Sequence, residues 1–199
     1  MSITFQYNKT SLQYLQKQMQ TRLSALPVLK NKESALRIEV KKTRDEIAEL
    51  DTLIDSHKLR IQQLSTLWQD FDMSLIDIET VTMETVMVAG VKIPKLGDIN
   101  FFVKKFNLFS KPHWYGDGIK IMKEISTIAI EKEFLVRKML LLDKARKKTT
   151  QKVNLYEKNQ IPEYDLAIKK IKRFMEDEEN LAKSSQKILK NKLQKSAGS

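Results

Sequence analysis

The sequence has no cysteine, and it has only five glycines and four prolines among its 199 residues. The absence of cysteine excludes disulfide bonds, thiolate zinc sites and cysteine nucleophiles. So little glycine and proline leaves few residues for the turns of a compact fold with many elements, which indicates an elongated, mostly helical chain. Aromatic residues make up 8% and charged residues 31%. This balance favours helices with solvent-exposed outer faces over a fold with a large hydrophobic core.

Long apolar runs are also missing. No stretch approaches the ~20 apolar residues of a membrane-spanning helix. The first ten residues lack the basic and apolar regions of a secretory signal. We therefore expect a cytoplasmic protein with no direct membrane insertion.

The usual signs of catalysis are absent as well. The only histidines are His57 and His113, and the sequence contains no GxSxG, HExxH or phosphate-binding loop pattern. His57 has no second ligand at matching spacing, so we interpret it as a polar residue on a helix face. The sequence predicts no catalytic residue, no cofactor, no metal site and no enzymatic activity.

An apolar ladder in alternating steps of three and four residues runs through residues 12–75. This spacing is typical of a coiled-coil helix that needs a partner helix along its length. Thr10 followed by Gln13 matches a capping box, so we expect the helix to start near residue 10. Pro27 lies inside the ladder, where we expect a kink and not an end. The ladder residues, mostly apolar, are Leu12, Leu15, Met19, Arg22, Leu26, Leu29, Glu33, Leu36, Val40, Thr43, Ile47, Leu50, Ile54, His57, Ile61, Leu64, Trp68, Phe71 and Leu75.

A second ladder begins near Gly118 and has the same step pattern. It changes phase around residues 159–162, where Pro162 predicts a kink or a local unwinding, and then continues to Ile188. Two ladders of comparable length predict one antiparallel coiled coil with both chain ends together. The predicted fold is therefore mainly α, with an N-terminal helix in residues 1–75 and a C-terminal helix with a basic tail in residues 119–199.

Residues 76–118 differ from both ladders because β-branched residues crowd into them. Short apolar alternations flank Ala89 and Gly90, so we expect a small lobe that contains a β-hairpin. The turn falls either at Ala89-Gly90 or at residues 96–98, and the sequence leaves both positions open.

The net charge of +11, with a pI near 9.6, implies an acidic partner. Basic residues gather in residues 137–152 and in the tail after Asn180. A solvated helix face, an acidic protein cavity and nucleic acid are all compatible with this charge. Residues 137–152 contain no aromatic side chain on which bases could stack, which argues against nucleic acid.

Several short motifs stand out along the chain. The most specific is the pattern V-N-x-x-E-x-x-x-I-P in residues 153–162, because a coiled coil has no general need for Asn and Pro at that spacing. The others are a basic segment in residues 28–32, the sequence Val-Lys-Ile-Pro in residues 91–94 and a Tyr-Gly pair at 115–116. Together they resemble the D subunit of the V-type (vacuolar/archaeal-type) rotary ATPases. The candidate partner-contact or family-motif residues are Leu29, Lys30, Lys32, Ile93, Pro94, Val153, Asn154, Glu157, Ile161 and Pro162.

The resemblance implies the rotor axle of the central stalk in a V-type ATPase/ATP synthase. Such an axle couples ATP hydrolysis or synthesis in the hexamer of catalytic A and non-catalytic B subunits to proton or sodium transport through a membrane ring. The implied partners are the A and B subunits, the small F subunit of the central stalk and the funnel-shaped subunit above the ring, within a peripheral membrane complex. The alternatives are a static coiled-coil scaffold and a basic, helical nucleic-acid-binding protein.

Overall fold

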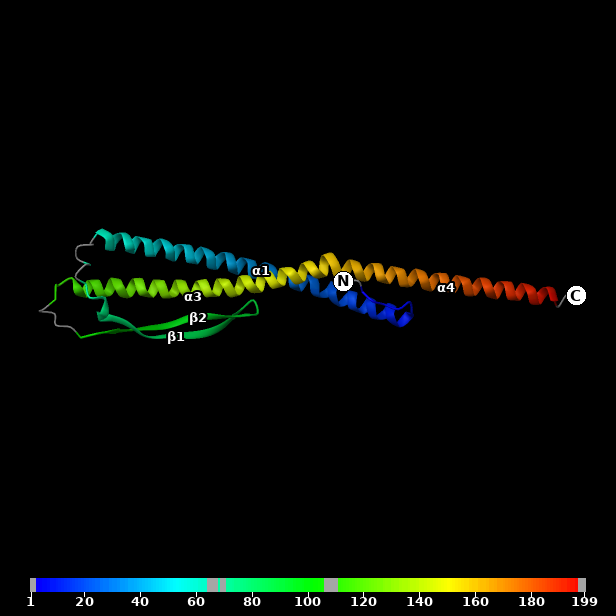
Figure 1. The fold of residues 1–199 in the computed structure, drawn as a ribbon, viewed down its shortest axis with the longest axis horizontal. Coiled ribbons are helices and arrows are strands. Elements are labelled where there is room, and N and C mark those ends of the chain that lie inside the picture. The colour runs from blue at the N-terminus through cyan, green and yellow to red at the C-terminus, as the bar shows by residue number, and fades with distance from the viewer. Residues whose placement is uncertain (1–2, 64–67, 69–70, 106–110, 197–199) are drawn as a thin grey trace. The chain divides into compact units, whose positions relative to one another are not determined.

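The computed structural model describes residues 3–63, 68, 71–105 and 111–196. Its elements are, in order, the helix α1 (Lys9–Gln63), a 3-10 turn (Met73–Leu75), the strands β1 (Ile76–Val88) and β2 (Val91–Val103), the helix α3 (Tyr115–Asn154), a π-helical segment (Leu155–Gln160) and the helix α4 (Ile161–Ser196) (Figure 1). The prediction of long N- and C-terminal helical segments with a small β-hairpin between them is confirmed.

The chain divides into two compact units, which are described separately. Residues 1–31 and 149–199 form the terminal unit, and residues 32–148 form the hairpin unit. In the terminal unit the start of α1 packs against α4, and in the hairpin unit the rest of α1 packs against α3 and the hairpin. The antiparallel helix packing that the ladders predict is present in both units.

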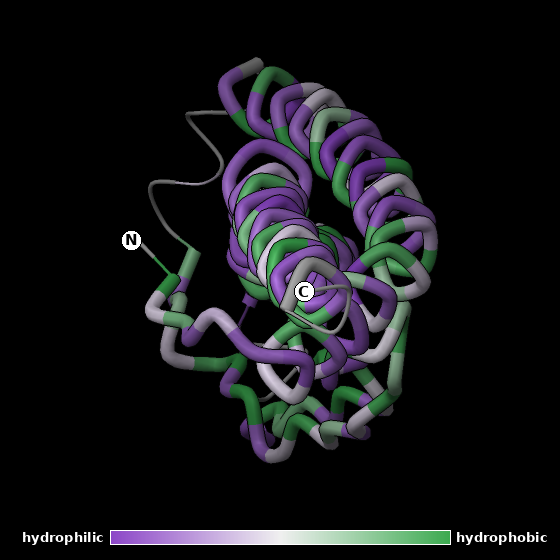
Figure 2. Tube along the Cα trace, turned by 90° about the vertical axis from the view of Figure 1, so that its right-hand side faces the viewer, coloured by the Kyte–Doolittle hydropathy of each residue, from purple (hydrophilic) through white to green (hydrophobic). Residues whose placement is uncertain are grey.

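The helix α1 is capped two residues earlier than the capping box suggested. The side chain of Asn8 accepts a hydrogen bond from the N–H of Ser11 at 2.7 Å, so Asn8 caps the helix in place of Thr10. The helix then continues through Pro27, as predicted. Its ladder residues from Leu12 to Ile61 are all buried or partly buried. Figure 2 shows hydrophobic residues recurring along otherwise hydrophilic helices.

The far end of α1 differs from the prediction, because residues 71–75 are not α-helical. The carboxylate of Asp72 accepts a hydrogen bond from the N–H of Ser74 at 3.0 Å and caps the 3-10 turn. Such a hydrogen bond between a side chain and the nearby backbone competes with the backbone hydrogen bonds of an α-helix. Phe71 and Leu75 are nevertheless buried, in a cluster with Tyr115 and Ile119 at the start of α3. Leu64, an earlier residue of the ladder, lies outside the described residues.

The hairpin turn is at Ala89-Gly90, one of the two predicted positions. Both residues have positive φ, 49° and 74°, which is the backbone of a type I′ turn between two twisted strands. Gly97 is a strand residue. A Cβ at this position would lie 2.5 Å from the hydroxyl oxygen of Thr82, so the glycine permits the close approach of the two strands beside an irregularity in their pairing.

The predicted phase change of the second ladder appears as the π-helical segment. The N–H of Ile161 donates to the carbonyl of Tyr156, five residues earlier, and this widens the turn. Pro162 gives the reason: it has no N–H, and its ring crowds the carbonyl four residues before it. Of the two alternatives that the sequence left open, local unwinding is the one observed.

The last part of α4 contradicts the prediction of a seam that extends to Ile188. The residues from Glu176 to Gln194 are exposed, including the ladder residues Leu181 and Ile188. The N-terminal residues Ile3 and Phe5 pack beside the cluster around Ile171 instead of beside the end of α4. The chain ends are therefore not paired, because α4 continues beyond the point where α1 begins.

Candidate functional site

The ten candidate residues divide between the two units. Seven lie in the terminal unit, around the π-helical segment: Leu29, Lys30, Val153, Asn154, Glu157, Ile161 and Pro162. The other three, Lys32, Ile93 and Pro94, lie in the hairpin unit.

Two of the candidates in the terminal unit bind each other. Lys30 Nζ of α1 lies 2.7 Å from Glu157 Oε1 in the π-helical segment, and each side chain is about half exposed. The pair joins two helical segments that are distant in the sequence, so it fixes how they align along their length. Because it is exposed to water, its contribution to stability is small, about 0–1 kcal/mol.

A second set of polar contacts in this region comes from Arg22, a residue that is not in any of the motifs. Its Nε donates to Gln160 Oε1 at 2.6 Å, and its Nη1 donates to Gln18 Oε1 at 2.7 Å. The guanidinium carbon also lies 4.8 Å from the centre of the Tyr164 ring, within cation–π range. The signal in the sequence was a charged residue on a mostly apolar ladder.

Arg22 therefore contacts both the π-helical segment, through Gln160, and the first turn of α4, through Tyr164. A planar guanidinium can donate in several directions at once, so it satisfies two amide oxygens while it stacks on aromatic rings. On either side of it the seam is apolar again, with Val153 buried on one side and Ala167 and Ile168 on the other. This arrangement sets the alignment of α1 against the second helical segment.

The other candidates of this group have different exposures. Leu29 and Ile161 are partly buried on the seam, whereas Asn154 and Pro162 are exposed. Asn154 ends α3, and Pro162 is the second residue of α4. The two exposed residues are available to a partner, and the two apolar residues support the helix pair.

In the hairpin unit, the hairpin tip packs onto the helices. Ile93 is buried in a cluster with Leu36 and Val40 of α1 and Leu142 of α3. Lys32 reaches over the turn, and its Nζ lies 3.2 Å from the place that a Cβ at Gly90 would occupy. Ala89 of the turn packs against the same apolar cluster, and this packing holds the turn against α1.

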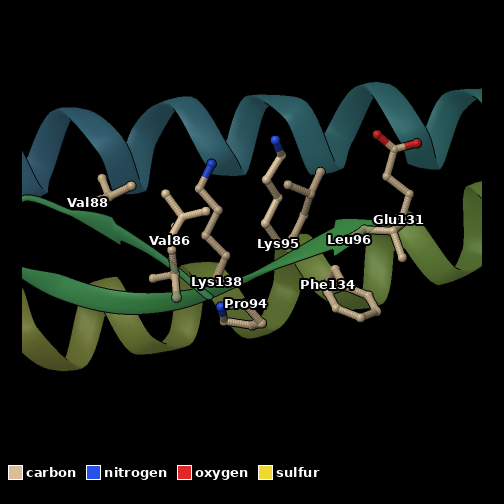
Figure 3. Close-up of a pocket in the computed structure, with 10 residues that line it drawn as sticks. Val86, Val88, Pro94, Lys95, Leu96, Glu131, Phe134 and Lys138 are labelled. Atoms are coloured by element: carbon tan, nitrogen blue, oxygen red, sulfur yellow. The ribbon is translucent and has the colours of Figure 1, made fainter. Parts of the chain in front are cut away.

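Pro94 pairs with Thr85 across the hairpin and, like its neighbour Ile93, lines a cavity of about 340 Å³ between the hairpin and α3. Figure 3 shows this cavity with Val86 and Leu96 from the strands and with Phe134 and Lys138 from α3. Its walls are mostly apolar.

These two regions are built from apolar packing contacts and an ion pair between helical segments. Among the described residues, no three His, Asp or Glu side chains gather closely enough to hold a metal ion. No described helix is both long enough and apolar enough to cross a membrane.

On α3, Arg146 and Lys147 both bind the carboxylate of Asp143. The hydrogen bond from Lys147 has the largest effect, and together with the one from Arg146 it lowers the pKa of the Asp143 carboxyl.

A protein family matches nearly the whole chain. The model of the family described as the D subunit of ATP synthase matches residues 11–191. The chain belongs to this family. That match includes all ten candidate residues and both strands of the hairpin. The match extends well beyond the motifs in residues 28–32, 91–94 and 153–162, which it contains.

Individual members of the D-subunit family support the assignment. The V-type ATP synthase D subunit of Borreliella burgdorferi is 34% identical over 120 residues, which cover 60% of this chain and 59% of that relative. The D subunit of Chlamydia pneumoniae is 26% identical over 200 residues, which cover 98% of this chain and 95% of the relative. That of Chlamydia abortus is 27% identical over 174 residues, 85% of this chain and 84% of the relative.

Proposed function

We propose that this member of the D-subunit family is the rotor axle of the central stalk in a V-type ATPase/ATP synthase. In this role it is non-catalytic and carries torque between the A/B hexamer and the membrane ring, on the cytoplasmic side of the membrane. The family match over residues 11–191 is the observation that carries the proposal. The relatives are named as subunits of an ATP synthase, so the chain works as one part of a larger complex.

An axle must keep its two helices aligned under torsion. The contacts around the π-helical segment suit this requirement, because Arg22 and Lys30 of α1 each bind a residue of that segment. Within each unit the seam is packed with apolar side chains. Sliding one helix along the other in the terminal unit would break both polar contacts and the packing at the same time.

The exposed end of α4 also supports a place inside a complex. Leu181, Ile188, Leu189 and Leu193 are all exposed on a helix that carries no acidic residue after Glu179. An apolar stripe of this kind is normally covered by another protein. We propose that the A and B subunits cover it, with the basic side chains beside it facing acidic surface.

For the remaining partners, the proposal follows the resemblance. The F subunit would bind near the hairpin unit, and the funnel-shaped subunit would receive the base of the axle. The exposed candidates Asn154 and Pro162 are proposed contacts within the head. A static scaffold would need the same helix pair, so rotation itself must be tested.

A crosslink between axle and head tests rotation directly. The chain has no cysteine, and Val28 is 67% exposed on α1, so Val28→Cys adds a single accessible thiol. It would be oxidised onto a cysteine engineered in a head subunit of the assembled complex. We expect the disulfide to stop steady ATP hydrolysis and a reductant to restore it.

The matched control is the complex that carries Val28→Cys alone, which should keep its activity under the same oxidation. A complex that is fully crosslinked, and that still hydrolyses ATP at the uncrosslinked rate, would contradict the rotor role. That outcome would favour the static scaffold within the same family.

A further inference from the structure

The strand β1 is the most exposed regular element of the hairpin unit. Its residues from Asp77 to Met87 are all exposed, whereas β2 alternates between exposed and partly buried residues along much of its length. The described residues form a sheet of two strands, so β1 is paired on one side only. Its other edge presents backbone N–H and C=O groups that no described strand satisfies.

The turn determines which backbone groups point to this free edge. In a two-residue hairpin the flanking residues, here Val88 and Val91, form a hydrogen-bonded pair, and the pairs then alternate. Thr85 and Pro94 therefore form a non-hydrogen-bonded pair. Pro94, which has no N–H, fits this position, because its nitrogen faces away from β1. By the same geometry, the N–H and C=O of Thr85 point outward from β2.

The two edges of the hairpin are protected differently. β2 carries Pro94, Lys92 and Lys95, the residue types that keep a sheet edge from pairing with another chain. β1 contains no proline, lysine or arginine in its 13 residues. The described chain therefore leaves the edge of β1 open from Met83 to Val88, where its pairing with β2 is regular, and blocks the edge of β2.

The charge of β1 is opposite to that of the whole protein. It carries Asp77, Glu79 and Glu84 and no basic residue, in a chain whose net charge is +11. A second copy of β1 is a poor partner, because antiparallel pairing about the middle of the strand places Glu79 close to Glu84, and like charges repel across strands. A basic strand would instead meet opposite charges.

The outward face of β1 adds apolar contact surface. Met83 and Met87 are 66% and 65% exposed, and they lie on the same face because side chains alternate along a strand. Methionine side chains are flexible and adapt to different partner shapes. The opposite face is partly covered near the turn, where Val86 and Val88 line the cavity against α3.

We propose that the free edge of β1 binds an extended, basic segment of a partner protein, which adds as a third strand. Backbone hydrogen bonds at alternate residues such as Thr85 hold the segment, and Asp77, Glu79 and Glu84 select lysine or arginine on it. This mode of recognition takes its affinity from the main chain and its specificity from the side chains. The proposal does not depend on rotation and applies equally to a static scaffold.

Calorimetry on the full chain tests the proposal with two short capped peptides as probes. One alternates lysine with valine, and the other alternates glutamate with valine. We expect the lysine peptide to bind and the glutamate peptide to bind at least about tenfold more weakly, since the cross-strand charge pairs change sign. Amide hydrogen exchange should show new protection at Met83, Thr85 and Met87 when the lysine peptide is bound.

Backbone and charge are then separated by variants. Thr85→Pro removes the outward N–H without removing a hydrogen bond to β2, so it should abolish binding of the lysine peptide. Thr85→Ala keeps that N–H and should bind within about twofold of the unchanged chain. The double variant Glu79→Lys and Glu84→Lys should prefer the glutamate peptide, and this result does not rely on proline being tolerated in the strand.

Three outcomes would overturn the proposal. The first is no binding of the lysine peptide, which would mean that the acids only protect the edge from pairing. The second is equal binding of both peptides. The third is unchanged binding by Thr85→Pro with the hairpin amides still protected, which would place the peptide elsewhere on the chain.

Discussion

The two halves of α4 have the same apolar spacing and opposite surroundings. Its first half, up to Met175, packs against the start of α1, and Ile171 there is fully buried. Its second half continues the ladder through Leu181 and Ile188, which are 69% and 57% exposed. Heptad spacing therefore reports that a helix has an apolar stripe, and it does not report which molecule covers that stripe.

The largest expected difference between the halves is at their isoleucines. Ile171→Asp places an unpaired charge in the buried cluster, and it should lower the free energy of unfolding by roughly several kcal/mol. Ile188→Asp, at an exposed position of the same ladder, should change it by no more than about 0.5 kcal/mol. Urea denaturation of the isolated chain measures both. Equal losses would mean that the second half is packed in solution.

A smaller effect is expected where ladder residues carry hydroxyl groups. Thr43 is fully buried on α1, and its Oγ1 has no hydrogen-bond partner among the described residues. Thr43→Val replaces this hydroxyl with a methyl group and should raise the free energy of unfolding by about 1 kcal/mol. Urea denaturation measures this change as well.

Ser185 of α4 is the matched control, because it lies three residues before Ile188, on the spacing of the second ladder, in the exposed half. Ser185→Val should leave the stability of the isolated chain unchanged within about 0.5 kcal/mol. If Thr43→Val instead lowers the free energy of unfolding, the Thr43 hydroxyl forms a hydrogen bond in solution. That result would contradict the prediction that the hydroxyl is buried at a cost in stability.

The smallest effect concerns charge in the exposed half of α4. Glu179 Oε1 lies 2.7 Å from Lys183 Nζ, and the hydrogen bond and charge of Lys183 lower the pKa of the Glu179 carboxyl. A lowered pKa in the folded state means that the pair stabilises the helix above the pKa of the unfolded chain. This stabilisation is lost as the pH falls through the folded pKa.

Carbon-detected NMR titration of the Glu179 carboxyl checks this expectation. Lys183→Ala should raise the pKa of Glu179 toward its ordinary value and leave the buried half of α4 unchanged. A Glu179 pKa that does not respond to Lys183→Ala would show that the exposed half is not helical at this turn in solution.

Several elements could be predicted from the residues because they depend on local chemistry. The ladder of α1 follows from spacing alone, and so does the hairpin between residues 76 and 103. Pro162 predicted a disturbance in the second helix because it removes a backbone donor. Of the candidate site residues, Lys30 and Glu157 came from separate motifs, and the fold brought them into one ion pair.

Other features depend on contacts between distant parts of the chain. The sequence did not assign Arg22 a role, since its partners Gln160 and Tyr164 become neighbours only after the helices pair. Nor did the sequence show that Gly97 lies inside β2, where it makes room for a side chain of the other strand. The end of α1 was misplaced because Phe71 keeps the ladder spacing but is buried outside an α-helix, against the start of α3.

The sequence by itself determined the helical character of this protein, the polarity of its surfaces and its membership of the D-subunit family, because these depend on residue type and spacing. Tertiary structure decided which stretches of the ladders are covered, where α4 loses its partner and which edge of the hairpin stays open. The physical reason is that an apolar face or a strand edge is a local property, whereas its burial depends on which other segment reaches it.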